Sequence, residues 1–160
     1  MLYRNTGRGF ENVSKQSGPI FSKLIAGRGL AIGDFDNDGS VDALVSVNNG
    51  APVLLRNNAG RRNHWLGLQL VTKDRRPAAG TKLILEVNGH KLTRFAKGGS
   101  SYLSANDTRH LFGLGTATKP GKLRIEWSSG TPRTEEWSDL AIDSYQRIVQ
   151  GSGKNVGALN

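Results

Sequence analysis

The 160-residue sequence contains no cysteine and no long apolar run. Without cysteine, disulfide bridges, thiolate metal sites and cysteine nucleophiles are excluded. No stretch approaches the roughly 18–20 apolar residues that a membrane-spanning helix needs, so we expect no membrane insertion. The first residues also lack the hydrophobic segment of a signal peptide. Either the protein stays inside the cell, or the sequence is a piece of a longer secreted protein.

Glycine is abundant instead, with 21 residues, and helical periodicity is scarce. Apolar residues fall in short alternating or continuous runs bounded by Gly, Asn, Asp, Ser or Pro, which is the pattern of β-strands. Asn88 and Gly89 stand between two such runs and predict a two-residue hairpin. We therefore expect an all-β fold with strands at residues 30–32, 43–47, 52–55, 64–71, 82–87, 90–95, 122–127 and 147–149.

A short repeat lies near the start of the chain. Residues 2–7 recur as residues 54–60, so that Arg4 and Arg56 are 52 positions apart. A period of roughly 40–50 residues with several short strands is typical of one β-propeller blade. The chain holds one such unit and the last strand of the unit before it. Because a single blade cannot close a ring, we expect a C-terminal piece of a longer protein.

A Gly-, Asn- and Arg-rich linker over residues 57–63 divides the sequence. We expect three parts: a repeat unit over residues 1–60, a second β domain over residues 61–150, and a flexible glycine-rich tail over residues 151–160.

Residues 34–42 form the most informative segment, because four carboxylates stand at positions 1, 3, 5 and 9 of one loop. Oxygen ligands at alternate positions suit Ca²⁺. Gly39, at position 6, permits a sharp turn, and the next residue offers its backbone carbonyl. The candidate metal ligands are Asp34, Asp36, Asp38, Ser40 and Asp42.

This loop is not an EF-hand. Position 12, where an EF-hand has a bidentate Glu, is Val45. The flanking segments are also strand-like rather than helical. An Asp- and Gly-rich turn that binds no metal remains the alternative. We favour calcium, because turn chemistry alone does not require four acids in register with the glycine.

Residues 29–33, the acidic loop, residues 43–47 and residues 54–58 together resemble the FG-GAP or VCBS-type repeat of integrin-like and bacterial β-propellers. In that family the loop carries Ca²⁺ between two strands of a blade. The resemblance implies side-chain ligands from Asp34, Asp36, Asp38 and Asp42, and a carbonyl ligand from Ser40.

Residues 63–68, 98–104, 107–115 and 125–130 resemble the ASPIC/UnbV domain, which follows FG-GAP repeats in larger proteins. This resemblance spans about residues 61–150, where we expect an antiparallel β-sandwich-like domain. The family has no established catalytic residues, and its larger members are mostly thought to be secreted. The resemblance therefore implies an extracellular or periplasmic location, as part of a longer secreted protein.

The formal charge of +9 is unevenly distributed: residues 56–97 hold ten Lys and Arg but only two acidic residues. Such a surface can hold polyanions, for example an acidic polysaccharide. Ordinary solubilising charge is the simpler interpretation, and we favour it. Nucleic acid is not expected, because no helix, zinc finger or RNP-like motif accompanies the charge. The polyanion candidates are Arg61, Arg62, Lys73, Arg75, Arg76, Lys91, Arg94 and Lys97.

No catalytic residues are assigned. Ser100, Ser101, Ser104, Asp107 and His110 offer the components of a triad, but no nucleophile elbow frames the serines. Glu135 and Glu136 are adjacent, so on a strand they point to opposite faces and make a poor acid–base pair. We expect solvated edge charge at that position.

The sequence as a whole predicts a calcium-binding, non-enzymatic extracellular module for binding or adhesion, with a protein or an acidic polysaccharide as partner. One alternative is an enzyme or enzyme accessory of secondary-metabolite biosynthesis, in which Ser104, Asp107, Arg109 and His110 would converge. Another is an assembly element that caps a propeller and associates with the remaining blades of the parent protein or with itself.

Overall fold

The structure is a computed structural model that describes residues 1–59, 62–99, 102, 104–131 and 133–156. Within these residues the regular structure is β-strand apart from two short 3-10 turns, which confirms the all-β prediction. Neither turn is long or apolar enough to cross a membrane. The elements are β1 (Tyr3–Asn5), β2 (Phe10–Asn12), η1 (Ser14–Gln16), η2 (Pro19–Ser22), β3 (Gly27–Gly33), β4 (Asp42–Val47), β5 (Val53–Leu55), β6 (His64–Val71), β7 (Lys82–Val87), β8 (His90–Phe95), β9 (His110–Gly115), β10 (Leu123–Glu126), β11 (Thr134–Trp137), β12 (Tyr145–Val149) and β13 (Lys154–Asn155).

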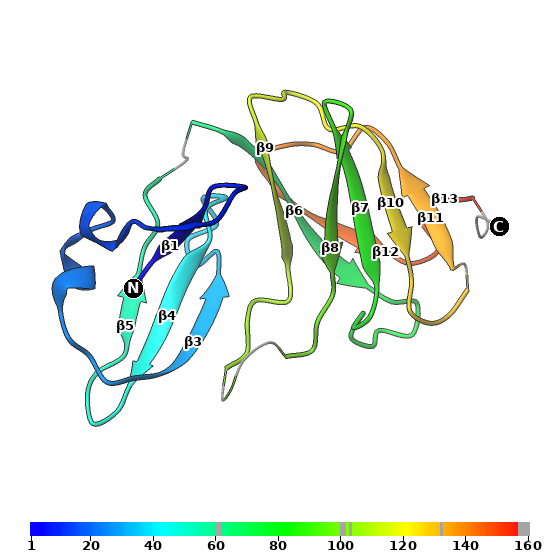
Figure 1. Cartoon of the computed structure of the whole chain (residues 1–160). Helices are drawn as coiled ribbons and strands as arrows, with labels where there is room; N and C mark the ends of the chain where they lie inside the picture. Colours follow the sequence, from blue (N-terminus) through cyan, green and yellow to red (C-terminus); the bar gives the residue numbers. More distant parts are fainter. Residues whose placement is uncertain (60–61, 100–101, 103, 132, 157–160) are drawn as a thin grey trace.

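The strands form four sheets, which Figure 1 shows from one end of the chain to the other. A β1–β2 hairpin and a three-stranded sheet in the order β3-β4-β5 make the N-terminal part. The C-terminal part has a five-stranded sheet, β13-β11-β10-β7-β8, and a three-stranded sheet, β12-β6-β9.

The hydrophobic core lies between the two C-terminal sheets. Alternate residues along each strand point inward, as the period of two requires, and the opposite residues face outward. The fully buried apolar side chains are Leu66, Leu68 and Phe112 from the three-stranded sheet, and Leu83, Leu85, Leu123 and Ile125 from the five-stranded sheet.

The predicted hairpin joins β7 to β8. Asn88 and Gly89 have φ values of 48° and 78°, and Val87 pairs with His90 across the turn. Positive φ at both central residues is what a type I′ turn needs, so this prediction is confirmed.

The C-terminal domain is not wholly antiparallel, and the sequence-based expectation is wrong at one pair. β12 runs parallel to β6, with Tyr145 opposite Gly67. The two strands are separated by most of the domain, so no hairpin turn imposes an antiparallel direction on them. The expected strands also omitted β9, β11 and β13 of this part of the chain.

The interpretation of Glu135 as solvated edge charge is wrong. β13 pairs on the outer side of β11, and the Glu135 side chain is fully buried. Its carboxylate accepts hydrogen bonds from Trp127 Nε1 at 2.8 Å, from the Gly151 amide at 2.9 Å and from the Gly153 amide at 2.8 Å. Three donors compensate for burial of the charge, and they attach the chain after β12 to β11.

We expect Glu135→Ala to lower the free energy of unfolding by about 3 kcal/mol or more, because it leaves three buried donors without an acceptor. Glu136→Ala is the matched control. Glu136 lies half-buried on the opposite face and makes only long ion pairs, at 3.7 Å to Lys122 and 3.9 Å to Arg124. Its loss is expected to cost less than about 1 kcal/mol. Urea unfolding measures both, and equal losses would contradict the role given to Glu135.

Candidate functional site

Three carboxylates converge in the loop between β3 and β4. The two strands are antiparallel, and Gly33 is paired with Asp42 where the loop closes. One oxygen from each of Asp34, Asp36 and Asp42 lies within 4.8 Å of the others. This group can hold a metal ion.

Two of these carboxylates are already oriented by the backbone. Asp34 accepts hydrogen bonds from two amides of the loop, both at 3.0 Å. Asp42 accepts from the Phe35 amide at 2.9 Å and from the Asn57 amide, after β5, at 2.8 Å. Because each carboxylate oxygen has more than one acceptor site, these bonds position Asp34 and Asp42 without using all of their acceptor capacity.

Asp36 differs from its two neighbours. Both of its carboxylate oxygens are buried, and Oδ1 accepts no hydrogen bond from the residues that the structure describes. Oδ2 is in direct contact with the Arg56 guanidinium. This guanidinium supplies one positive charge against three converging carboxylates, so a metal cation fits the chemistry of this donor set.

The remaining predicted ligands lie beside this group rather than in it. Asp38 is not among the three converging carboxylates, and its Oδ1 accepts a hydrogen bond from the Ser40 amide at 2.9 Å. Ser40 is buried. Asn37 and Gly39 have φ values of 58° and 83°, which produce the sharp turn predicted at the glycine.

Three side chains from the C-terminal strands contact the loop. We call them the platform: Trp65 of β6, Tyr145 of β12, and Arg109 immediately before β9. The Tyr145 hydroxyl donates to Asp34 Oδ2 at 2.7 Å. Arg109 donates to the Asp34 carbonyl at 2.8 Å and to Asn37 Oδ1 at 2.5 Å. The platform therefore holds Asp34, which is also one of the three converging carboxylates.

The platform is held together by close packing. A Cβ at Gly67 would lie 2.2 Å from the Tyr145 ring, so glycine is needed beneath it. The Arg109 guanidinium lies 4.1 Å from the centroid of that ring, and the Trp65 ring meets it edge-on at 5.1 Å. Burial, the hydrogen bond to Asp34 and the charge of Asp34 raise the pKa of Tyr145, so its hydroxyl stays protonated as a donor.

Asp107 fixes Arg109 in place. Burial of the Asp107 carboxyl opposes its ionisation, but hydrogen bonds and the charge of Arg109 outweigh burial and lower its pKa. The two form an ion pair at 2.6 Å. A Cβ at Gly33 would lie 2.9 Å from the Asp107 Cβ, so the glycine allows this close approach to β3.

The segment before β9 also covers the free edge of β3. The Leu30 amide donates to Ser104 Oγ at 2.9 Å, and the Ile32 amide donates to Asn106 Oδ1 at 3.0 Å. The Asp107 amide in turn donates to the Ile32 carbonyl at 2.9 Å. Side chains thus satisfy edge groups that another strand would otherwise pair.

Residues considered for a catalytic site are only partly brought together. Asp107, Arg109 and His110 line one cavity, but Ser104 does not. The Ser104 hydroxyl accepts from Leu30 and donates to the Tyr102 carbonyl at 3.0 Å. Ser100 and Ser101 lie outside the described residues.

The polyanion candidates are spread over several elements. Arg94 and Lys97 line the same cavity as His110. Arg76 forms an ion pair with Asp74 at 3.2 Å, and Lys91 lies opposite Glu86 on the β7–β8 hairpin. Lys73 and Arg75 belong to the loop after β6, Arg62 lies just before β6, and Arg61 is outside the described residues.

Comparison with known families identifies the C-terminal part of the chain. The model of the family described as ASPIC and UnbV matches residues 71–155, more than half of the chain. The chain belongs to the ASPIC/UnbV family. Arg109 and Tyr145 lie inside the matched region, and the three converging carboxylates lie before it in the sequence.

The chain is also similar to cartilage acidic protein 1. The proteins of that name from Xenopus tropicalis, Mus musculus and Homo sapiens are each 32% identical to it over 128 residues, which is 77% of this chain. The chain spans about a fifth of the length of these relatives.

Sequence reasoning missed the platform of this ASPIC/UnbV chain. Trp65 and Tyr145 are not among the predicted site residues, although both contact the loop. The available signal was Gly67, because a glycine in the middle of an expected strand often marks a close approach of another group.

Gly39→Ala tests how closely the loop packs on the platform. A Cβ there would lie 2.3 Å from the Trp65 ring, and φ is +83°. We expect a loss of about 1–3 kcal/mol beyond that of Gly89→Ala. Gly89 has φ +78° with open space around its Cβ position, so this control carries the backbone strain alone, about 1–2 kcal/mol. Urea unfolding compares the two, and equal losses would contradict the contact with Trp65.

Proposed function

We propose that residues 1–60 are an FG-GAP/VCBS-type repeat whose loop binds Ca²⁺, and that the chain is a non-enzymatic binding or adhesion module of an extracellular or periplasmic protein. The observation that carries this proposal is Asp36. Its carboxylate is buried beside those of Asp34 and Asp42, where the Arg56 guanidinium supplies one positive charge against three carboxylates.

Calcium is favoured by the kind of donors in the loop. They are carboxylate and carbonyl oxygens, which suit a hard cation. Ca²⁺ takes six to eight oxygens in flexible geometry, whereas Mg²⁺ demands a near-ideal octahedron. Asp38 and the Ser40 carbonyl lie next to the converging group and would complete its shell. We assign the ion a structural role: it neutralises the loop and holds Asp34 against the platform.

We favour a binding role over catalysis, because the polar side chains near the loop are already used in hydrogen bonds and ion pairs within the fold. The hydroxyl of Ser104 and the carboxylate of Asp107 are both used in attaching the segment before β9 to β3 and to Arg109. Extracellular calcium modules bind the ion with dissociation constants of roughly 10⁻⁴–10⁻³ M, which suits the proposed location.

Calcium should stabilise the protein. In saturating Ca²⁺ at about 100 times the dissociation constant, the expected gain is about 2.7 kcal/mol, or a rise in Tm of about 5 °C or more. Asp36→Ala should abolish this rise, and Mg²⁺ should not reproduce it. The measurement is thermal unfolding of chelator-treated protein during titration. Asp74→Ala, which removes an exposed carboxylate distant in sequence from the loop, should keep the full response.

Arg56 provides a second arm of the same test. Its guanidinium is the cation that faces Asp36, so Arg56→Gln should lower stability in chelator and raise the affinity for Ca²⁺. Arg4→Gln is the matched control, because Arg4 occupies the equivalent place in the repeat and forms an exposed ion pair with Glu11 at 2.7 Å. A calcium response that is absent from the wild-type protein, or unchanged in Asp36→Ala, would overturn the calcium site.

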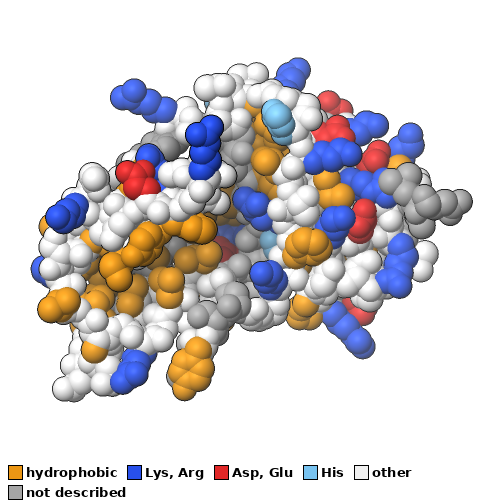
Figure 2. Space-filling view, viewed as in Figure 1, with side chains coloured by type: hydrophobic (Ala, Val, Ile, Leu, Met, Phe, Trp, Pro, Cys, Tyr) orange, Lys and Arg blue, Asp and Glu red, His pale blue; other side chains and the backbone are white. Residues whose placement is uncertain are grey.

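A role in assembly is the second candidate, favoured by the apolar surface of the sheet β3-β4-β5. Figure 2 shows hydrophobic side chains gathered over this part of the molecule. Leu30 and Ile32 are 48% and 44% exposed, and Leu44 and Leu54, which are paired across β4 and β5, are each 45% exposed. Both faces of the sheet therefore retain apolar surface that neighbouring blades or a second copy would cover.

If assembly is the role, sedimentation velocity should show concentration-dependent self-association, since burial of these side chains drives it. Leu44→Glu should abolish the association, and Thr93→Glu, at an exposed site on β8, should not. A monomer across the whole concentration range would count against self-association.

A further inference from the structure

A cavity of about 330 Å³ lies where the N-terminal sheet meets the C-terminal strands. On one side are Ile32, Asp34 and Val41, and on the other are β8, the glycines after it and the start of β9. In Figure 2 the surface is hollowed between these two parts, with Lys or Arg side chains at its rim. Its size is at the lower end of the range for small-molecule sites.

The charged residues of the cavity leave a surplus of one positive charge. Three cations line it (Arg94, Lys97 and Arg109) against two carboxylates (Asp34 and Asp107). Arg109 is committed to Asp107 and to the loop. The cations that remain for a ligand are therefore Arg94 and Lys97.

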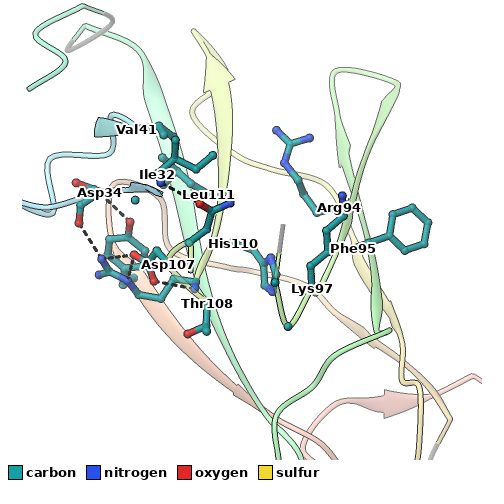
Figure 3. Close-up of a pocket in the computed structure, with 16 residues that line it drawn as sticks. Ile32, Asp34, Val41, Arg94, Phe95, Lys97, Asp107, Thr108, His110 and Leu111 are labelled. Carbon is teal, nitrogen blue, oxygen red and sulfur yellow. Dashed lines mark hydrogen bonds and ion pairs between the residues drawn. The ribbon is translucent and has the colours of Figure 1, made fainter. Parts of the chain in front are cut away.

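Among the residues that the structure describes, neither of these cations forms an ion pair with a carboxylate. Arg94 packs over the Phe112 ring, 5.4 Å from its centroid, and donates one hydrogen bond, to the Thr93 carbonyl at 3.1 Å. A guanidinium has five N–H donors, so most of them stay available. In Figure 3, Arg94, Lys97 and His110 lie on one side of the cavity and Asp34 and Asp107 on the other.

The cavity also offers apolar surface. Ile32 and Val41, on the side opposite β8, are 44% and 45% exposed, and Leu111 of β9 also lines the cavity. A bare inorganic ion would leave this surface in contact with water, whereas a ligand with an apolar body would cover it.

We propose that this cavity binds a small organic monocarboxylate, with its acid group between Arg94 and Lys97 and its apolar body against Ile32, Val41 and Leu111. The single surplus charge matches a monoanion better than a phosphate dianion. Hydrogen bonds from two cations to a carboxylate are among the stronger polar contacts. This site goes beyond the proposed calcium-binding function and uses different side chains for recognition.

His110 provides a reporter within the cavity. Burial and the positive charge of Arg94 lower the pKa of its imidazole, and Asp107 partly opposes them. The other charged groups of the cavity are Asp34, Lys97 and Arg109, and Tyr145 also lines it. A carboxylate bound beside Arg94 adds negative charge, which favours the protonated imidazole and therefore raises the pKa of His110.

The test uses benzoate as the probe, benzamide as its neutral counterpart and inorganic phosphate as a bare anion. Binding is followed by NMR on the full chain in calcium-containing buffer, with the His110 imidazole titrated against pH at each ligand concentration. Benzoate should bind saturably and raise the pKa of His110, and benzamide should do neither. Arg94→Gln and Lys97→Gln should each weaken benzoate binding about five- to tenfold.

Lys91→Gln is the matched control. It removes the same charge from β8 at a residue that does not line the cavity, so benzoate affinity should be unchanged. Thermal unfolding of each variant shows that it is folded. The proposal is overturned if benzoate does not bind, if benzamide binds equally well, if phosphate binds as tightly as benzoate, or if Lys91→Gln weakens binding as much as Arg94→Gln.

Discussion

Mutual repulsion of three carboxylates within 4.8 Å of one another is the constraint around which the N-terminal half of this molecule is arranged. Each carboxylate is compensated differently. Asp34 and Asp42 accept backbone amides, and Asp36 faces the Arg56 guanidinium. Arg56 supplies one positive charge against the three carboxylates, and the buried Oδ1 of Asp36 accepts no hydrogen bond from the described residues. A cation at this position would remove both the repulsion and the cost of desolvation.

The same constraint joins the two halves of the chain. Asp34 is one of the three converging carboxylates. It also accepts a hydrogen bond from the Tyr145 hydroxyl, and its backbone carbonyl accepts one from Arg109. Whatever fixes Asp34 therefore also fixes the platform, and through Asp107 the covered edge of β3. Asp34 also lines the cavity beside Arg94. A cation bound at the loop and a ligand bound in the cavity would therefore both contact the surroundings of this one residue. Linkage requires any such coupling to act equally in both directions.

Local features of this structure could be read from the sequence, and features made by distant residues could not. The strands over residues 64–71, 82–87 and 90–95 match β6, β7 and β8, because alternation and the Asn88–Gly89 turn are local signals. The acidic loop was found because its spacing is local too. The roles of Tyr145 and Glu135 depend on a parallel pairing and on a strand, β13, that joins β11 from far along the chain. No sequence pattern encodes those encounters.

The internal repeat illustrates the same limit. Arg4 and Arg56 occupy equivalent places in two similar segments, and sequence alone treats them alike. In the structure, Arg4 pairs with Glu11 at the surface, where both side chains are more than half exposed and solvent screens the contact. Arg56 instead faces Asp36, whose side chain is 23% exposed. The repeat therefore specifies a strand and the turn after it, while the surroundings decide whether its arginine pairs with an exposed carboxylate or with one of three converging carboxylates.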